Sequence, residues 1–452
     1  MENSDKKSIL SKFISIFVSV FPWREVLTFV ITAVFMVLAL VAVAEIPKEN
    51  IKGKLTESAE YLKDKNLEMQ IDGVSCSYVH SYADAMLLDI AYYYDSNRPL
   101  ASIMKAEYYR NQDKSLNESF VEAIKLDKEP NNEYIRYWHG SNVIVRTLHK
   151  WFSIKSLYVI NAVLLTVLFV GLTVFFIKKR YFAPAVGLPA GLIAVSIWFV
   201  PMTLESAWNF LLLAPFSLCA VLTAGKDKDK RFGVLFLCFG MLTNYLDFLS
   251  TETITLTVPL LLVLYIENKK ENDFSVMFKT SVKASVSWGF GYAGAWVMKW
   301  IIASVVLGEN VMPYVTEHIT ERIGGDNSMI AAGPIMVFFD TLTRNIGCLF
   351  PFNYGAAGAM IGTVIFILCA YMIFVYRGKN CNKRLIILYA VVGCIPYLRY
   401  LVLHNHAYLH YFFTYRAQLS TVLAVALIMD ELKIWGTFRR TRLHEKRHQK
   451  RA

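Results

Sequence analysis

SYADAMLLDIAYYYDSNRPL, from Ser81 to Leu100, and RYWHGSNVIVRTLHKWF, from Arg136 to Phe152, belong to a polar segment that runs from about Ile46 to Ser156. Each stretch mixes charged, aromatic and apolar residues too closely for a plain linker. One apolar run precedes the segment and nine follow it. We therefore expect this long loop, with shorter loops on the same side, to form a polar site over a bundle of helices.

The composition is that of a membrane protein. Of the 452 residues, 55% are hydrophobic and only 18% are charged, whereas a soluble domain carries about a quarter charged residues. The net charge of +11 could suggest nucleic acid, but the basic residues cluster between apolar runs and in the tail, where membrane topology explains them. We expect no nucleic-acid partner. The seven cysteines are scattered without a disulfide framework or a metal-binding spacing.

Spanning a bilayer takes roughly twenty apolar residues, and ten runs approach that length. They are Val26–Ile46, Leu157–Ile177, Pro184–Val200, Thr203–Thr223, Phe232–Ser250, Thr251–Ile266, Val282–Leu307, Ala356–Tyr376, Leu385–Leu403 and Tyr411–Met429. The sequence thus predicts an all-α integral membrane protein of about ten transmembrane helices, with a large first extracytoplasmic loop that carries surface helices. One of these, from Tyr82 to Tyr94, is expected to lie along the membrane surface.

The charge of the connecting segments predicts the orientation. Basic connections at Lys178–Arg180, Lys226–Arg231, Glu267–Asn272 and Arg377–Arg384 alternate with connections that hold few or no basic residues. By the positive-inside rule the basic connections and both termini are cytoplasmic, in a multi-pass protein of the plasma membrane. The expected parts are a cytoplasmic amphipathic N-terminus (1–24), a first transmembrane helix (25–46), an extracytoplasmic loop (47–156), a polytopic bundle (157–430) and a basic cytoplasmic tail (431–452).

Most of the unusual polar residues fall on the outer side, where they can mark a functional site. Asp84, flanked by apolar residues near the interface, is a candidate general base. Asp89 lies five positions on, so the two carboxylates diverge by roughly 140° on a helix and only one can face a substrate. The sequence leaves open which of them is the base, and a solvated Asp84 on an amphipathic helix is the alternative.

Histidines and cations supply further candidates. His406 and His410 share a helix face at i and i+4, yet no HExxH motif and no nearby carboxylate completes a metal site. We expect no metal cofactor and favour hydrogen bonds to loops or to a lipid headgroup, with a divalent metal as the alternative. Arg344, Arg416 and Lys299 lie near outer ends of apolar runs. Arginine suits bidentate phosphate binding there, whereas snorkelling to the interface is the simpler explanation.

The RYWHG stretch precedes the second apolar run. Tryptophan is common where a span meets the membrane interface, so we expect Trp138 to be an interfacial anchor. His139, beside Arg136, is a candidate contact for a sugar or a diphosphate.

This layout resembles the GT-C superfamily of polytopic glycosyltransferases, such as the dolichyl-phosphate-mannose protein mannosyltransferases. The resemblance lies in a first span, a large external loop with an early acidic residue, and short outer loops rich in aromatic and basic residues. It implies a polyprenyl-phosphate-sugar donor, Asp84 as base, and Arg416, Lys299 and Arg344 near the phosphate. The chain lacks the adjacent acidic pair of the mannosyltransferases. The implied reaction inverts the anomeric carbon, and a glycan, a lipid or a protein could be the acceptor.

Other functions fit the same pattern. A transporter or flippase for a lipid-linked or amphiphilic solute would need a continuous polar path at mid-bilayer, which the few candidates, Asn209, Asn244 and Lys299, do not make. A polysaccharide polymerase or ligase also uses arginine and histidine against a lipid diphosphate. A non-catalytic assembly protein is a further alternative. Membrane lipid is an expected partner in every case.

Overall fold

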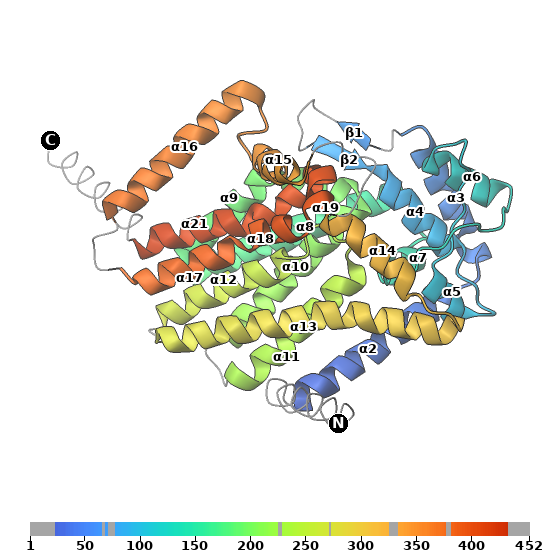
Figure 1. Cartoon of the computed structure of the whole chain (residues 1–452), viewed down its shortest axis with the longest axis horizontal. Coiled ribbons are helices and arrows are strands. Elements are labelled where there is room, and N and C mark those ends of the chain that lie inside the picture. Colours follow the sequence, from blue (N-terminus) through green and yellow to red (C-terminus); the bar gives the residue numbers. More distant parts are fainter. Residues whose placement is uncertain are drawn as a thin grey trace.

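The computed structural model describes residues 23–65, 68–70, 77–224, 228–270, 273–324, 333–376 and 381–432. Within these ranges the regular secondary structure is helical apart from two short antiparallel strands, β1 (Glu68–Gln70) and β2 (Tyr78–His80). The predicted amphipathic N-terminus and basic tail lie almost entirely outside the described residues. The helices form a long bundle with a helical domain at one end (Figure 1).

Seven helical segments of the described chain are long and apolar enough to cross a membrane. They are α2 (Trp23–Ala44), α8 (Ile154–Lys178), α10 (Leu204–Thr223), α13 (Phe274–Leu307), α16 (Gly355–Tyr376), α17 with α18 (Lys383–Gly393 and Ile395–Val402), and α20, η3 and α21 (Tyr411–Thr414, Tyr415–Gln418 and Leu419–Glu431). Large apolar side chains such as Val30, Val163 and Phe366 are exposed on their outer faces. The protein is therefore an all-α, multi-pass membrane protein.

Ten spans were expected, but three of the predicted runs, which form α9 (Phe182–Ala194), α11 (Lys228–Leu246) and α12 (Ile254–Lys269), are not among the helices long and apolar enough to cross a membrane in the described chain. After α9, Ser196 takes a left-handed conformation and the chain continues as the 3-10 helix η2 (Ile197–Met202). Between α11 and α12, polar side chains form a hydrogen-bonded turn that uses up residues of both runs. Apolar composition did not reveal the interruption after α9, whereas the tight turn between Phe248 and Thr251 in the sequence already suggested a hairpin that penetrates the membrane incompletely.

Five helices form the domain at the end of the bundle, drawn in blue to cyan in Figure 1: α3 (Glu49–Lys63), α4 (Ser81–Tyr92), α5 (Pro99–Lys105), α6 (Leu116–Lys125) and α7 (Asn142–Leu148). We call it the α3–α7 domain. Ten of the twelve residues of α4 are buried, and α4 contacts α3, α6, α7 and α10. The predicted helix over Tyr82–Tyr94 thus exists but forms the centre of this domain and does not lie along a membrane surface.

A buried arginine fastens the α3–α7 domain to the first span. The guanidinium of Arg146 donates to the carbonyl oxygens of Val43 (2.8 Å), Ile46 (2.6 Å), Ala91 and Tyr94 (3.3 Å). These carbonyls lie at the C-terminal ends of α2 and α4, where the helix dipole favours a positive charge. One side chain therefore joins two helix ends.

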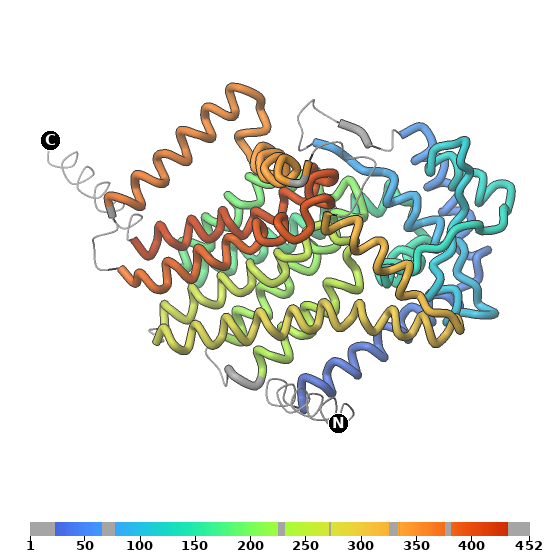
Figure 2. The backbone as a smooth tube through the Cα atoms, in the orientation of Figure 1, coloured from blue at the N-terminus to red at the C-terminus, as the bar shows by residue number. Residues whose placement is uncertain are grey.

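At the opposite end of the bundle, polar contacts tie α12, α17 and α21 together. Lys269 pairs with Asp430 at 2.9 Å, and Glu431 accepts hydrogen bonds from the Asn268 amide and from the backbone N–H of Asn382, each at 2.9 Å. Figure 2 shows α13, in yellow, running along the bundle from this end to the α3–α7 domain. The bundle thus has two distinct ends.

Three further helices cover the end of the bundle that carries the α3–α7 domain. They are α14 (Met312–Ile323), α15 (Pro334–Gly347) and α19 (His404–Leu409). Both α14 and α15 contact α19. These helices bring the histidines of α19 next to the α3–α7 domain.

Candidate functional site

A cavity of about 150 Å³ lies where the α3–α7 domain meets the bundle. Its walls come from α4, the loop before α7, the first turn of α10, the turn after α11, and helices α14, α19 and α20. Its lining residues are His80, Tyr82, Ala83, Met86, Leu87, Ile90, Tyr134, Arg136, Tyr137, His139, Glu205, Phe248, Arg322, His406, His410 and Phe413. The volume suits a small polar group rather than a whole lipid.

Two arginines give the cavity a positive character. Arg136 stacks on Tyr134, with its guanidinium carbon 4.3 Å from the ring centre, and donates to the Tyr134 hydroxyl at 2.7 Å. Arg322 donates to the backbone carbonyl of His318 at 2.8 Å. In both side chains the Nε is buried without a hydrogen-bond partner. Neither guanidinium pairs with a carboxylate among the residues that the structure describes, so both remain available to an anion.

Three of the predicted site residues, His139, His406 and His410, line this cavity. Burial lowers the pKa of His139 to about 3 and that of His406 well below its usual value, so both rings are neutral at pH 7. The Nε2 of His139 lies 3.0 Å from the carbonyl oxygen of Tyr134 and donates to it. No group of three histidine, cysteine or acidic side chains that could hold a metal ion exists within the described ranges.

Among the described residues that line the cavity, Glu205 carries the one carboxylate. Its Oε2 lies 3.2 Å from the Nδ1 of His80. Glu205 lies in the first turn of α10, where the Thr203 side chain caps the helix by accepting a hydrogen bond from the backbone N–H of Ser206 at 3.2 Å. The site therefore contains the Glu205 carboxylate paired with the His80 imidazole, as well as the two arginines.

Asp84 lies behind the cavity wall formed by its neighbour Ala83 and is fully buried. Its carboxylate accepts hydrogen bonds from the backbone N–H groups of Leu204 (2.9 Å) and Glu205 (3.3 Å) and from the Tyr158 hydroxyl (2.5 Å). Burial raises the pKa of Asp84 to about 7, although the Tyr158 hydrogen bond opposes the rise. Asp84 thus fixes the turn that carries Glu205.

Asp89 diverges from Asp84, as the helical spacing predicts. It accepts a hydrogen bond from the backbone N–H of Tyr109 at 2.9 Å inside the α3–α7 domain. It is fully buried and does not line the cavity.

The three predicted phosphate-binding cations do not line the cavity. The Nζ of Lys299 donates to the carbonyl oxygens of Ile103 (3.2 Å) and Met104 (2.9 Å) at the C-terminal end of α5. Arg344 is exposed on α15, where it stacks on Tyr408 at 4.0 Å. Arg416 is buried in η3. Lys299 therefore joins a helix end to the bundle.

The RYWHG stretch, from Arg136 to Gly140, contributes several residues to the site. Arg136, Tyr137 and His139 line the cavity, and His139 has a left-handed backbone with φ of 53°. Trp138 is fully buried and donates its indole N–H to the carbonyl of Ala295 at 2.9 Å, so the expected interfacial anchor is wrong. A Cβ on Gly140 would lie 2.4 Å from the Tyr245 ring, so only glycine fits there.

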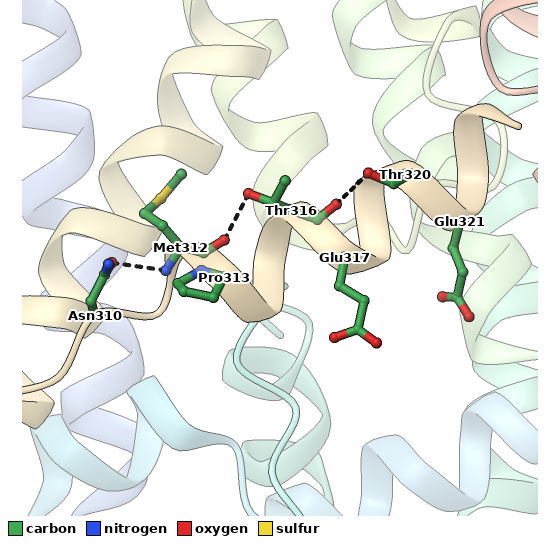
Figure 3. A pocket seen from close by; sticks show the side chains of 7 residues that line it. All are labelled: Asn310, Met312, Pro313, Thr316, Glu317, Thr320 and Glu321. Carbon is green, nitrogen blue, oxygen red and sulfur yellow. Dashed lines mark hydrogen bonds between the residues drawn. The ribbon is translucent and has the colours of Figure 1, made fainter. Parts of the chain in front are cut away.

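A second, open groove of about 640 Å³ runs along α14. It is lined by Asn310, Met312, Pro313, Thr316, Glu317, Thr320 and Glu321 (Figure 3). The two threonine hydroxyls donate to carbonyls of their own helix, and Glu317 and Glu321 project from the same side of α14. None of the described residues that line the groove is basic, so it does not suit an anion.

Sequence reasoning did not select Arg322, Glu205 or His80 for the site. Glu205 has a detectable signal, because an acidic residue follows a helix cap at the outer end of an apolar run. Arg322 has none, since only the packing of α14 against α19 brings it to the cavity. Comparisons of the chain with known protein families, with curated proteins and with solved structures found no match.

Proposed function

We propose that the protein is a glycosyltransferase of the GT-C type, which transfers a sugar from a polyprenyl-phosphate donor to an acceptor outside the cytoplasm. The observation that carries the proposal is the cavity between the α3–α7 domain and the bundle. It combines two arginines that have no acidic partner among the described residues, a carboxylate paired with a histidine, and several aromatic rings. This transfer needs cations that stabilise the anionic leaving group, a base for the acceptor hydroxyl, and a surface on which the sugar ring can stack.

The two arginines are assigned to the lipid phosphate. As the bond between the anomeric carbon and the phosphate oxygen breaks, the lipid phosphate leaves with the electron pair and gains negative charge. Arg136 and Arg322 stabilise that charge through hydrogen bonds to its oxygens. Tyr82, Tyr134 and Tyr137, which line the same cavity, provide stacking surfaces for the sugar ring.

Glu205 is assigned as the general base. The acceptor hydroxyl attacks the anomeric carbon, its proton passes to the Glu205 carboxylate, and the configuration inverts because the displacement is single. Asp84 becomes a positioning residue, because its carboxylate binds the backbone N–H of Glu205. Direct catalysis by Asp84, as the resemblance implies, stays a prediction.

The orientation is part of the proposal. We assign the α3–α7 domain to the extracytoplasmic face of the plasma membrane and the opposite end of the bundle to the cytoplasm. Lys178, Lys269 and Lys383, which flank α8, α12 and α17, belong to the basic connections at that opposite end. Both termini are assigned to the cytoplasm on the charge pattern of the sequence.

A transfer assay in lipid nanodiscs tests the proposal. The probes are polyprenyl phosphate carrying radiolabelled glucose, mannose or galactose, and the readout is release of polyprenyl phosphate. We expect turnover of one donor, a loss of about 100-fold or more in kcat with retained donor binding for Glu205→Gln, and donor binding at least about tenfold weaker for Arg136→Ala. Arg344→Ala, at an exposed arginine outside the cavity, is the control. Absence of both turnover and polyprenyl-phosphate binding in the wild type refutes the proposal.

A further inference from the structure

One histidine of the cavity, His406, contacts a buried ion pair formed by Arg399 and Glu252. Arg399, on α18, donates through Nε to the Glu252 carboxylate at 2.9 Å and through one terminal nitrogen to the Leu249 carbonyl at 2.7 Å. That same terminal nitrogen lies 3.3 Å from the Nδ1 of His406. Arg399 and Glu252 are both buried, so water does not compete for these contacts.

The direction of the contact between Arg399 and His406 decides the tautomer of the ring. A guanidinium has only donors, so Nδ1 of His406 must accept the hydrogen bond. A neutral imidazole with an accepting Nδ1 carries its proton on Nε2. The Nε2 of His406 has no hydrogen-bond partner among the described residues, and the side chain lines the cavity.

We propose that Arg399, held by Glu252, is a positioning residue that fixes His406 as a donor of an Nε2–H hydrogen bond to the anionic group bound in the cavity. Under the proposed function, on which this inference rests, that group is the phosphate of the lipid donor. A ring with the opposite tautomer would turn a lone pair toward the phosphate oxygens and repel them. Arg399 therefore acts on the ligand through His406, without touching it.

The partners of Arg399 come from separate elements. Leu249 and Glu252 lie in the turn between α11 and α12, whereas His406 lies on α19. A buried ion pair contributes little to stability on average, so stability alone is a weak reason for this arrangement. The contact of Arg399 with His406 is not needed for the ion pair itself. Orientation of this cavity histidine accounts for it.

A double-mutant cycle separates positioning from a structural role. The variants are Arg399→Met with Glu252→Gln, which removes the guanidinium without leaving a buried carboxylate unpaired, and His406→Gln, whose amide nitrogen takes the place of Nε2–H whatever its neighbour. The probe is polyprenyl phosphate in nanodiscs. We expect the pair variant to weaken binding about tenfold in the wild-type background and less than about twofold in the His406→Gln background. Equal losses in the two backgrounds would overturn the inference.

The tautomer itself can be read without any ligand. Nitrogen-15 NMR of the histidine-labelled protein distinguishes Nε2–H from Nδ1–H rings, and loss of signals in His406→Gln assigns this ring among the nine histidines. We expect a single Nε2–H tautomer in the wild type and a mixture in the pair variant. An Nδ1–H or doubly protonated ring in the wild type contradicts the inference. If the wild type binds no polyprenyl phosphate, the proposed function fails, and the spectrum alone decides whether Arg399 sets the tautomer.

Discussion

At the scale of single residues, four cations at the junction of the α3–α7 domain and the bundle fall into two groups. Arg146 and Lys299 donate to backbone carbonyls at helix C-termini, where the partial negative charge of the helix end compensates theirs. Arg136 and Arg322 each keep a buried Nε without a partner in the described part of the chain. The first group stabilises the fold, and the second group is available to a ligand.

Asp84 makes stability depend on pH. Its pKa is about 7 in the folded protein and about 3.8 in an unfolded chain, so between these values the folded state holds the extra proton. The contribution of Asp84 to stability is therefore greatest below pH 4, falls as pH rises toward 7, and is constant above it. Between pH 5 and pH 8 the wild type should lose about 2 to 3 kcal/mol relative to Asp84→Asn.

Thermal unfolding of the two proteins in detergent at pH 5, 6, 7 and 8 measures this difference. The exposed Asp113→Asn serves as control and should follow the wild type at every pH. A constant gap between wild type and Asp84→Asn across the range would mean that the folded-state pKa of Asp84 is not raised to about 7, and would contradict the prediction.

At the scale of elements, helices α11 and α13 pack unusually closely. A Cβ on Gly240 would lie 2.1 Å from the Trp288 carbonyl oxygen, and a Cβ on Gly291 would lie 2.3 Å from the Leu237 carbonyl oxygen. Both positions oppose backbone, which cannot move aside as a flexible side chain can. Small residues at such contacts are typical of helix pairs in membranes.

Gly291→Ala should therefore destabilise the protein by about 2 kcal/mol or more, because α11 and α13 must separate. Gly289, two residues earlier and on the opposite face of the same helix, has no atom within 4 Å of an added Cβ. Gly289→Ala is thus the matched control and should be neutral or stabilising by up to about 1 kcal/mol, since alanine favours helix. Melting temperatures of the two variants test this; equal losses would refute the close contact.

At the scale of the whole molecule, the fold follows largely from the order of the apolar runs. All ten predicted runs contain helices, because apolar length is a strong signal. The end of α9 was not predictable, since it depends on a backbone turn at Ser196. The tight turn between α11 and α12 was visible in the sequence, but the hydrogen bonds around Asp247 that shape it form only in the folded chain. The helix over Tyr82–Tyr94 was predicted, but its burial depends on its neighbours.

The candidate site was predictable only in part. His139 and His406 could be predicted because histidine is a polar residue that is uncommon beside the ends of apolar runs. The sequence predicted that Lys299 binds a phosphate, whereas its partners are carbonyl oxygens of α5. No sequence pattern distinguishes a lysine that binds a phosphate from one that binds a helix end. Arg322 and His80 reach the cavity from segments far apart in the chain, so tertiary packing alone identifies them.

The central claim is that the phosphate of a polyprenyl lipid binds in the cavity between the α3–α7 domain and the bundle. The most direct test is a cryo-EM map of the protein in nanodiscs with added polyprenyl phosphate. We predict phosphate density within hydrogen-bonding distance of Arg136 and Arg322, with Glu205 facing the same space. Phosphate density beside Arg344 or Arg416 instead, or a cavity that stays empty at saturating lipid, would contradict the claim.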